Sequence, residues 1–349
     1  MSASFALALA LVSCGAEPNA PPSVEKIVAE TVIADAADAD TPAAESEIVP
    51  ELEYEAMAEA LRAEALESRG PGAPALWKVS DHDSTIYLFG TVHYLRPSTK
   101  WMTPDIQAAF DQSDRLVIET DIHSRSARDQ MWHLYRHYGL FPVERSLLDY
   151  TTDEQAKKIK AAADKFDMTF DQIVQLKPWL LMSILMGETK VGPDDFKRAF
   201  GVEEVLLERA RKQNKKLGYM ESADAQISVV PTISLTEQVA DLVEALDAQD
   251  QGGDFLDELV AEWADGDVEG LASMLAMDPT MHADNGYYEA LLPNRNRNWI
   301  PKIEVLLNVP GTSFVAVGAA HLAGEDSVIK MLEEEHLIAE RLYGAKVSR

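Results

Sequence analysis

Cysteine is almost absent from this chain of 349 residues, which contains Cys14 and no other cysteine. A single cysteine can form neither an intramolecular disulfide nor the paired Cys-x-x-Cys ligands of a zinc ribbon. Any metal site in this protein must therefore be built from His, Asp and Glu.

Basic residues are also scarce. The chain has 31 Lys plus Arg against 59 Asp plus Glu, which gives a formal net charge of −28. Proteins bind DNA and RNA largely because Lys and Arg displace counterions from the phosphates. This charge argues against a nucleic-acid partner.

Long apolar runs are missing as well. Residues 5–13 are uncharged and mostly apolar, but a membrane-spanning helix needs about 20 such residues. The run is typical of a signal peptide, and Leu11-Val12-Ser13-Cys14 resembles a bacterial lipobox. We therefore predict a signal peptide over residues 1–13 and a membrane anchor through lipidated Cys14. The alternative is a short buried N-terminal strand or helix with an ordinary core cysteine.

The residue after the lipobox bears on localisation. Gly15 follows Cys14, where an Asp is usually associated with retention in the inner membrane. We expect the protein in the cell envelope of a Gram-negative-type bacterium, anchored in the outer membrane and facing the periplasm.

Residues 15–75 form an acidic segment rich in Ala and Pro. It carries 14 acidic residues against Lys26, Arg62 and Arg69, a net charge of −11, and has few large apolar residues. Such a composition cannot offset the entropy of ordering the chain. We predict a disordered tether, followed by one folded domain over residues 76–349 with a net charge of −17. A chain of that length can bury a core without disulfides.

Four short apolar runs in this domain predict core strands, at residues 85–89, 115–118, 216–220 and 313–317. Helical patterns lie between them, at 105–113, 152–166, 202–212 and, as three consecutive helices, 234–277. Strands separated by helices predict an α/β fold with a small, central, partly parallel sheet. A large helical insertion is expected at about residues 124–200.

The most informative feature is a repeated motif. Ile86 to Leu95 and Phe314 to Ala323 align without a gap: four apolar residues, a Gly, two small or β-branched residues, then a His. Glycine lets a chain turn tightly where it leaves a strand, and ligands of open α/β sheets bind at the carboxyl ends of the strands. We therefore predict that His93 and His321 meet at one edge of the sheet.

Carboxylates end two of the other strands. Glu119 closes the strand at 115–118, Glu221 follows the strand at 216–220, and Glu203 stands at a helix start. A carboxylate that is buried without a partner is costly, so each should meet a cation or a metal. The simpler alternatives are that Glu119 pairs with Arg115 or Arg125 and that Glu203 is an ordinary first-turn acid favoured by the helix dipole.

Two other histidines could bind metal on one helix face. His133 and His137 are four residues apart on a predicted helix. The segment lacks the intervening Glu of the His-Glu-x-x-His zinc motif. A solvated or packed helix face is the better interpretation.

The domain resembles the TraB/GumN family, a group that includes the Tiki proteases. The resemblance spans about residues 76–345. It rests on Trp77-Lys-Val-Ser, Ser84 to His93, Leu116 to Glu119, Gly201-Val-Glu203, Met220-Glu221-Ser222, Arg295-Asn296 and Val315 to Leu322. It implies duplicated βα halves, related to erythromycin-esterase and haem-binding ChaN-like proteins.

The resemblance also implies a divalent-metal-dependent peptidase, with Mn, Co or Zn as candidate metals. It transfers the motif positions to Gly90, His93, Glu119, Gly318 and His321, and an Arg-Asn pair to Arg295 and Asn296. In this hypothesis His93, His321 and a carboxylate hold the metal, which lowers the pKa of a bound water and polarises a carbonyl. Glu119 is either a ligand or the general base, and in the second case Glu221 or Glu203 is the ligand.

Three functions are compatible with these residues. The first is a tethered metallohydrolase that acts on a peptide or another amide or ester. The second is a haem- or metal-binding lipoprotein without turnover, and the third is a scaffold that has lost its activity. The sequence keeps every motif residue, which argues against the third.

Overall fold

The computed structural model of the chain describes residues 73–121, 124–166, 168–187, 196–250, 254–276 and 286–343. The predicted signal peptide, Cys14 and nearly all of the acidic tether lie outside these residues. None of the helices in the described part is long and apolar enough to cross a membrane.

The strands of the described residues form one sheet in the order β4-β3-β5-β2-β1-β6. They are β1 (Leu76–Ser80), β2 (Ser84–Thr91), β3 (Arg115–Ile118), β4 (Lys216–Tyr219), β5 (Gly311–Gly318) and β6 (Glu340–Tyr343). Neighbours among β4, β3, β5 and β2 are parallel, whereas β1 is antiparallel to both β2 and β6. The predicted α/β fold with a partly parallel sheet is confirmed.

The four predicted core strands are β2, β3, β4 and β5, and β1 and β6 were not predicted. Lys78 interrupts the apolar pattern of β1, and β6 reads Glu-Arg-Leu-Tyr, with no apolar run. Their pairing at one end of the sheet is what makes them strands: β1 forms a hairpin with β2, and β6 pairs along the outer side of β1.

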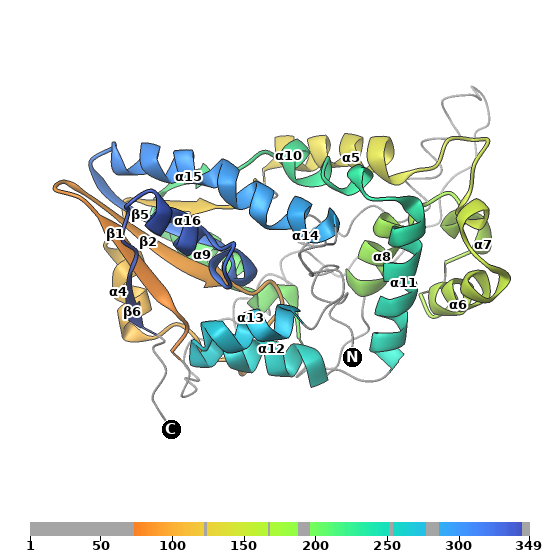
Figure 1. The fold of residues 1–349 in the computed structure, drawn as a ribbon, viewed down its shortest axis with the longest axis horizontal. Coiled ribbons are helices and arrows are strands. Elements are labelled where there is room, and N and C mark those ends of the chain that lie inside the picture. The colour runs from red at the N-terminus through yellow and green to blue at the C-terminus, as the bar shows by residue number, and fades with distance from the viewer. Residues whose placement is uncertain are drawn as a thin grey trace.

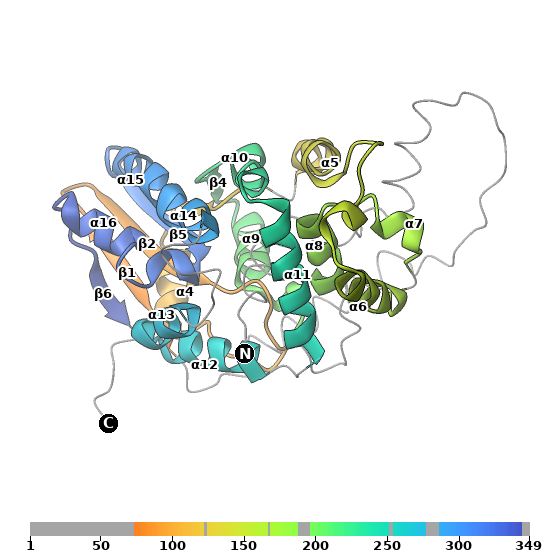
Figure 2. The same cartoon turned by 45° about the vertical axis from the view of Figure 1, so that its right-hand side comes forward.

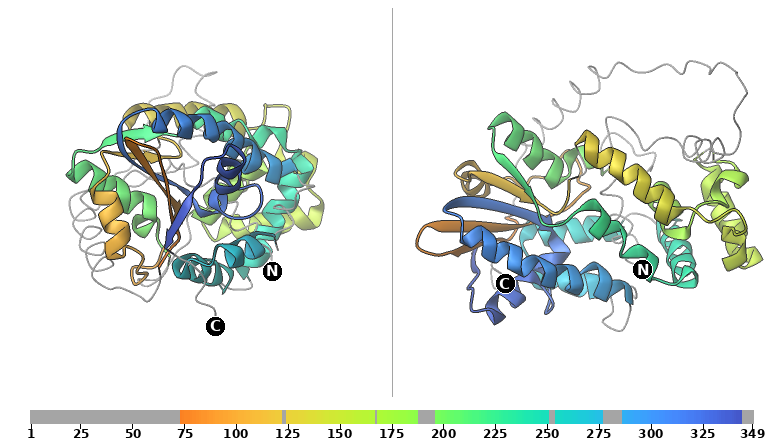
Figure 3. Two further views of the ribbon diagram at one scale, coloured as in Figure 1. Left: turned by 60° about the vertical axis from the view of Figure 1, so that its left-hand side comes forward. Right: turned by 90° about the horizontal axis from the view of Figure 1, so that it is seen from above.

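Helices cover both faces of the sheet. On one face, α4 (Pro104–Asp111) and α9 (Val202–Lys212) pack on Phe89 and Phe314. On the other, α15 (Pro293–Leu307) and α16 (Val328–Glu334) pack on Val117 and Val315. The left view of Figure 3 shows the strands between these two helical layers. Side chains that alternate along each strand therefore pack against helices on both faces of the sheet.

The predicted insertion is helical. It contains α5 (Arg125–Gly139), the 3₁₀ turn η2 (Leu147–Tyr150), α6 (Asp153–Asp164), α7 (Phe170–Ile173) and α8 (Pro178–Gly187). With α10 (Ala223–Ile227) and α11 (Leu235–Asp250) it shares a second core, which lies beside the sheet (Figures 1 and 2). The apolar segment at 179–186 forms α8, whose Trp179 and Leu181 are buried in this core.

The three consecutive helices predicted at 234–277 are confirmed as α11, α12 (Asp254–Asp265) and α13 (Val268–Ala276). The remaining elements are α14 (Gly286–Leu291) and the 3₁₀ turns η3 (Arg198–Phe200), η4 (Val230–Thr232) and η6 (Ala319–Leu322). Helices α12 and α13 lie across the end of the sheet at which β2 and β5 finish (Figure 1).

Candidate active site

The two Gly-x-x-His motifs lie side by side. Strands β2 and β5 are parallel neighbours, and Thr91 pairs with Gly318 at their carboxyl ends. His93 follows β2 by two residues, and His321 lies in η6, directly after β5. The predicted convergence of the two motifs at one sheet edge is therefore found in the fold.

The site has two halves, because the side chains at this edge alternate between the sheet faces. Thr91 continues the row of Phe89, which faces α9. Glu119 continues the row of Val117, which faces α15. One half therefore contains the carboxylate of Glu119 and the other the hydroxyl of Thr91.

Arg295 is the centre of the half on the α15 side. Its Nη2 atom donates to Oε2 of Glu119 at 2.5 Å and to Oε1 of Glu221 at 2.6 Å. Its Nε atom also donates to Oε1 of Glu221, at 2.9 Å. Both strand-terminal glutamates therefore meet a cation, as burial of a carboxylate requires. The cation is Arg295, and not the Arg115 or Arg125 weighed for Glu119.

The hydrogen bonds of His321 fix its tautomer. Asn296 donates through Nδ2 to the carbonyl of Asp326 at 2.7 Å, so its Oδ1 faces Nδ1 of His321, at 2.6 Å. An amide oxygen only accepts, and Nδ1 must therefore carry the proton. The Nε2 atom of His321 is then an acceptor, and Nη1 of Arg295 lies 3.1 Å from it.

Burial and these contacts set the charges. Burial and the charge of Arg295 lower the pKa of His321 to about 3, so its ring is neutral at neutral pH. Burial alone would raise the pKa of Glu119, but Arg295, the two histidines and the Gly318 N–H lower it to about 2. The site thus presents a neutral imidazole beside an ionised carboxylate, with Nε2 of His321 3.9 Å from Oε1 of Glu119.

His93 and Glu203 make up the other half. Nδ1 of His93 lies 2.7 Å from Oε1 of Glu203, which also accepts from the hydroxyl of Thr91. Burial alone would lower the pKa of His93, but the charge of Glu203 and its hydrogen bond, with the charge of Glu119, raise it. Burial alone would raise the pKa of Glu203, but the charge and hydrogen bond of His93, with Thr91, lower it. Glu203 is therefore more than a first-turn acid of α9.

Gly201 allows this half to assemble. It precedes α9, and the amide of Val202 donates to the carbonyl of Val92 at 3.0 Å. A Cβ atom at position 201 would lie 2.1 Å from the carbonyl oxygen of His93. Only glycine permits this close approach, which puts Glu203 within reach of His93.

The second motif glycine contacts the site directly. The amide of Gly318 donates to Oε1 of Glu119 at 2.6 Å, and a Cβ atom there would lie 3.0 Å from that oxygen. The backbone of β5 thereby orients the carboxylate that ends β3. Any larger residue at position 318 would push Glu119 away.

Two residues of the site were not identified in the sequence as functional. Trp299 donates through Nε1 to Oε2 of Glu221 at 3.2 Å, and its ring centroid lies 4.3 Å from that of His321. Thr91 supports Glu203. The spacing of Arg295 and Trp299, four residues apart on one helix, was the available signal for Trp299.

A metal site needs at least three ligand atoms close together. In the described ranges, one set of three His, Cys, Asp or Glu side chains has ligand atoms all within 4.8 Å of one another: Asp81, His82 and Asp83, exposed in the turn between β1 and β2. The ligand atoms of His93, His321 and Glu119 do not all lie within this distance of one another, although Nε2 of His321 and Oε1 of Glu119 are 3.9 Å apart. Their chemistry nevertheless fits a divalent cation, since imidazole and carboxylate are suitable ligands. The metal assignment stays a prediction.

The other histidine pair lies outside this site. His133 and His137 are exposed on α5, in the helical part of the protein. Their helix packs on α8 and α10. The packed or solvated helix face remains the interpretation for this pair.

Comparison with known proteins assigns the chain to a family. The chain is an α/β protein with paired Gly-x-x-His turns and a buried His, Glu and Arg cluster at the sheet edge. A model of the TraB/PrgY/gumN family matches residues 75–341, and the chain belongs to this family.

Two curated relatives share the printed name "Uncharacterized protein YbaP", one from Escherichia coli (strain K12) and one from Shigella flexneri. Each is 20% identical to this chain over 256 residues, which is 70% of this chain and 87% of the relative. No solved structure matches the chain. The family resemblance read from the sequence is thus confirmed.

Proposed function

We propose that this protein is a divalent-metal-dependent hydrolase of peptides or of another amide or ester. The observation that carries the proposal is the shared orientation of its two motif histidines. Nδ1 of His93 meets Glu203 at 2.7 Å, and Nδ1 of His321 meets Asn296 at 2.6 Å. Metal-binding histidines usually donate their second ring nitrogen to such an acceptor, which directs the other nitrogen to the metal.

The charge of the cluster supports a divalent ion. The two halves of the site together hold three carboxylates and the guanidinium of Arg295: Glu119 and Glu221 bind Arg295, and Glu203 binds His93. With both histidines neutral, two negative charges remain uncompensated in a largely buried site. A divalent cation would balance them, which favours a metal over a neutral ligand.

The residues have separate roles in this proposal. His93 and His321 through Nε2, with Glu119, would hold Mn, Co or Zn, and Nε2 of His321 would exchange its contact with Nη1 of Arg295, 3.1 Å away, for the metal. Glu203 would orient His93, and Arg295 would bind Glu221. When bound, the metal would supply a water of lowered pKa and a Lewis acid for the scissile carbonyl. Because the pKa of Glu119 is about 2, this carboxylate is better suited to be a ligand than a general base.

Arg295 and Asn296 are positioning residues in this proposal. Arg295 holds both strand-terminal glutamates, and Asn296 sets the tautomer of His321. A neutral His321 is the form that binds metal, whereas His93 must release its proton to do so. Metal binding should therefore weaken as the pH falls.

The test combines metal analysis with a cleavage screen. The purified full chain is titrated with Mn²⁺, Co²⁺ and Zn²⁺ by calorimetry, and a peptide library is assayed by mass spectrometry with each ion and with EDTA. We expect metal-dependent cleavage that both His93→Ala and His321→Ala abolish. Cleavage that persists in the double variant would contradict the proposal.

His82→Ala is the matched control, because His82 belongs to the exposed Asp81, His82 and Asp83 group. Metal that is lost in this variant but retained in His93→Ala would assign binding to the surface turn. The alternative function, haem or metal binding without turnover, predicts a haem absorption band or metal uptake that needs both motif histidines, with no cleavage.

We also propose that Cys14 carries a lipid that anchors the protein to the outer membrane, facing the periplasm. The lipobox-like residues before Cys14 support this proposal. Cys14→Ser should move the protein into the soluble fraction of fractionated cells. Unchanged association with the membrane would contradict the lipid anchor.

A further inference from the structure

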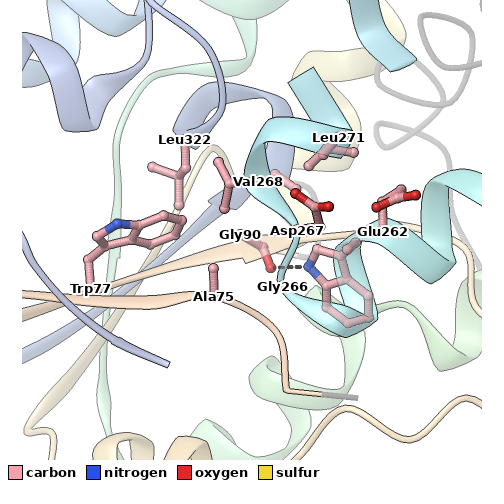
Figure 4. A pocket seen from close by; sticks show the side chains of 11 residues that line it. Ala75, Trp77, Gly90, Glu262, Gly266, Asp267, Val268, Leu271 and Leu322 are labelled. Atoms are coloured by element: carbon pink, nitrogen blue, oxygen red, sulfur yellow. Dashed lines mark hydrogen bonds between the residues drawn. The ribbon is translucent and has the colours of Figure 1, made fainter. Parts of the chain in front are cut away.

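Helix α12 contacts the first Gly-x-x-His turn on both sides of His93. Nε1 of Trp263 donates to the carbonyl of Gly90 at 2.9 Å, three residues before His93 (Figure 4). Three residues after His93, Arg96 donates to Asp257, through Nε to Oδ1 at 3.0 Å and through Nη2 to Oδ2 at 2.8 Å. One helix therefore holds the turn that carries His93 at both of its ends.

The two contacts differ in burial. Trp263 is 4% exposed, and its ring centroid lies 6.4 Å from that of Phe89 and 6.3 Å from that of Trp101. A buried carbonyl that loses its donor is costly, because water cannot replace the bond. Arg96 and Asp257 have side chains that are 31% and 49% exposed, and an exposed ion pair contributes little. Trp263 should therefore be the stronger contact of the two.

The end of β2 depends on α12 because β1 does not reach it. The pairing of β1 with β2 stops one residue before Gly90, so Gly90 and Thr91 have β5 as their one neighbouring strand. On the side that β1 leaves open, Trp263 supplies the donor for the carbonyl of Gly90. Thr91 donates to Glu203, the acceptor of His93, so a displaced strand end would also disturb that hydrogen bond.

Gly90 is also the point at which the two motifs touch. A Cβ atom on Gly90 would lie 3.0 Å from Cα of Ala319, which stands two residues before His321 in η6. Backbone packs directly on backbone there, so neither turn can shift without moving the other. Trp263 therefore holds the residue on which both motif turns depend.

We propose that α12 positions His93, with Trp263 as its main positioning residue and Asp257 as a second one. Trp263 acts through Gly90 on the end of β2, and thereby keeps the ring of His93 within reach of Glu203. The consequence for catalysis rests on the proposed metal-dependent hydrolase, whereas the effect on the His93 ring does not.

The test compares Trp263→Phe with Trp101→Phe in the purified full chain. Both substitutions remove an indole from the same aromatic cluster, and Trp263 is the one that donates to Gly90. The first readout is the tautomer of His93 in protein labelled with ¹⁵N-histidine, at a pH at which the ring is neutral. We expect a protonated Nδ1, directed at Glu203, in the wild type and in Trp101→Phe, and a mixture of both tautomers in Trp263→Phe.

Amide hydrogen exchange gives a second readout that needs no metal. The amide of Val202 donates to the carbonyl of Val92, inside the first motif turn, at 3.0 Å, and the amide of Met220 donates to the carbonyl of Ile118 at 2.8 Å, beside other strands of the sheet. Trp263→Phe should speed exchange at Val202 about tenfold relative to Met220. A merely structural role would speed exchange at both amides alike, and that result would overturn the proposal.

Metal affinity connects the positioning of His93 to the proposed function. The Kd for Mn²⁺ or Zn²⁺ should rise about tenfold in Trp263→Phe, the low end of the range for residues that orient a metal-binding histidine, and less in Asp257→Asn. Glu258→Gln, exposed on the same helix, is the control and should leave the Kd unchanged. A wild type that binds no metal would contradict the proposed function, and the two metal-free readouts would then decide the role of Trp263.

A second replacement covers the case in which Trp263→Phe does not fold. Incorporation of 3-benzothienylalanine at position 263 keeps the shape of the indole and removes its N–H, so it should change the His93 tautomer in the same way. A His93 tautomer that changes no more than in Trp101→Phe would overturn the proposal.

Discussion

The amide of Asn296 decides which ring nitrogen of His321 carries the proton. Its Oδ1 lies 2.6 Å from Nδ1 of His321, and it cannot rotate freely because its Nδ2 donates to the carbonyl of Asp326 at 2.7 Å. Both residues are almost fully buried, so water cannot easily replace either bond. Nε2 is therefore the acceptor of the ring, and burial with the charge of Arg295 keeps the ring neutral.

We expect Asn296→Ala to remove the preference of His321 for the tautomer that is protonated at Nδ1. In protein labelled with ¹⁵N-histidine, long-range NMR correlations of the wild type should show a protonated Nδ1 and an unprotonated Nε2 for His321, and the variant should lose this preference. Metal affinity should fall about 10–100-fold, as for other residues that orient a metal-binding histidine. Asn298→Ala, on the exposed side of α15, is the control. An unchanged His321 tautomer in Asn296→Ala would contradict the assignment.

The pKa values of the two motif histidines should be shifted in opposite directions from the ordinary value. The pKa of His93 is raised above 6.5, whereas the pKa of His321 is lowered to about 3. The His93 interaction therefore stabilises the fold below its unfolded pKa, near 6.5, and this stability is lost as the pH rises through the folded pKa. The His321 contribution is present above 6.5 and is lost as the pH falls towards 3.

NMR titration of the ring carbons measures both values. Glu203→Gln should lower the pKa of His93, because it removes the charge that raises it, and should leave that of His321 nearly unchanged. His321→Gln should reduce the loss of stability between pH 6.5 and 3 in urea unfolding. If both histidines titrate near 6.5 in the metal-free protein, the charge distribution described for the site is wrong.

Gly201→Ala should be strongly destabilising. Its Cβ atom would lie 2.1 Å from the carbonyl oxygen of His93, and backbone cannot move as cheaply as a flexible side chain. We expect a loss of about 1–3 kcal/mol in the free energy of unfolding, measured by urea denaturation. Gly218→Ala is the control, since its Cβ atom would meet a methyl group of Val117 at 3.2 Å. Equal effects of the two substitutions would show that Gly201 has no special role.

Arg295→Ala should cost more, because it leaves the carboxylates of Glu119 and Glu221 buried without their cation. Removal of one partner of a buried ion pair typically costs about 3–5 kcal/mol. Arg297→Ala, which breaks an exposed pair with Glu289, should change stability by about 0.5 kcal/mol or less. Urea unfolding measures both variants.

A double-mutant cycle isolates the pair. Adding Glu119→Gln to Arg295→Ala should recover part of the lost stability, since the buried charge is removed. Glu119→Gln alone should also flatten the acid limb of the stability curve. The pKa of Glu119 is about 2 when folded and 4.5 otherwise, so its contribution is present above 4.5 and lost as the pH falls towards 2. Full additivity would contradict the ion pair.

Local pattern was enough for most of the elements. The apolar runs at 85–89 and 313–317 lie within β2 and β5, and the start signal Thr103-Pro104 begins α4, where the Thr103 side chain accepts from the amide of Ile106. Strand β6 could not be found this way. Its residues become a strand because they pair with β1, which is a property of the partner and not of the segment.

The residues of the candidate site also fall into two groups, those that the local sequence identifies and those that it does not. The motif residues Gly90, His93, Gly318 and His321 were identified from their repeated spacing, and Glu119 from its position after an apolar strand. The partners were not: Arg295 was expected only through the family resemblance, and its ion pair with Glu119 spans 176 residues. Nothing in the local sequence specifies a contact across such a separation.

The sequence by itself determined most of the elements, the paired motifs, the scarcity of cysteine and the strong negative charge, because each depends on residue type and on neighbours a few positions away. Only the tertiary structure decided that Glu203 orients His93 and that Arg295, rather than Arg115, neutralises Glu119. Partner choice depends on which helix covers which face of the sheet, and that is settled by packing of the whole chain.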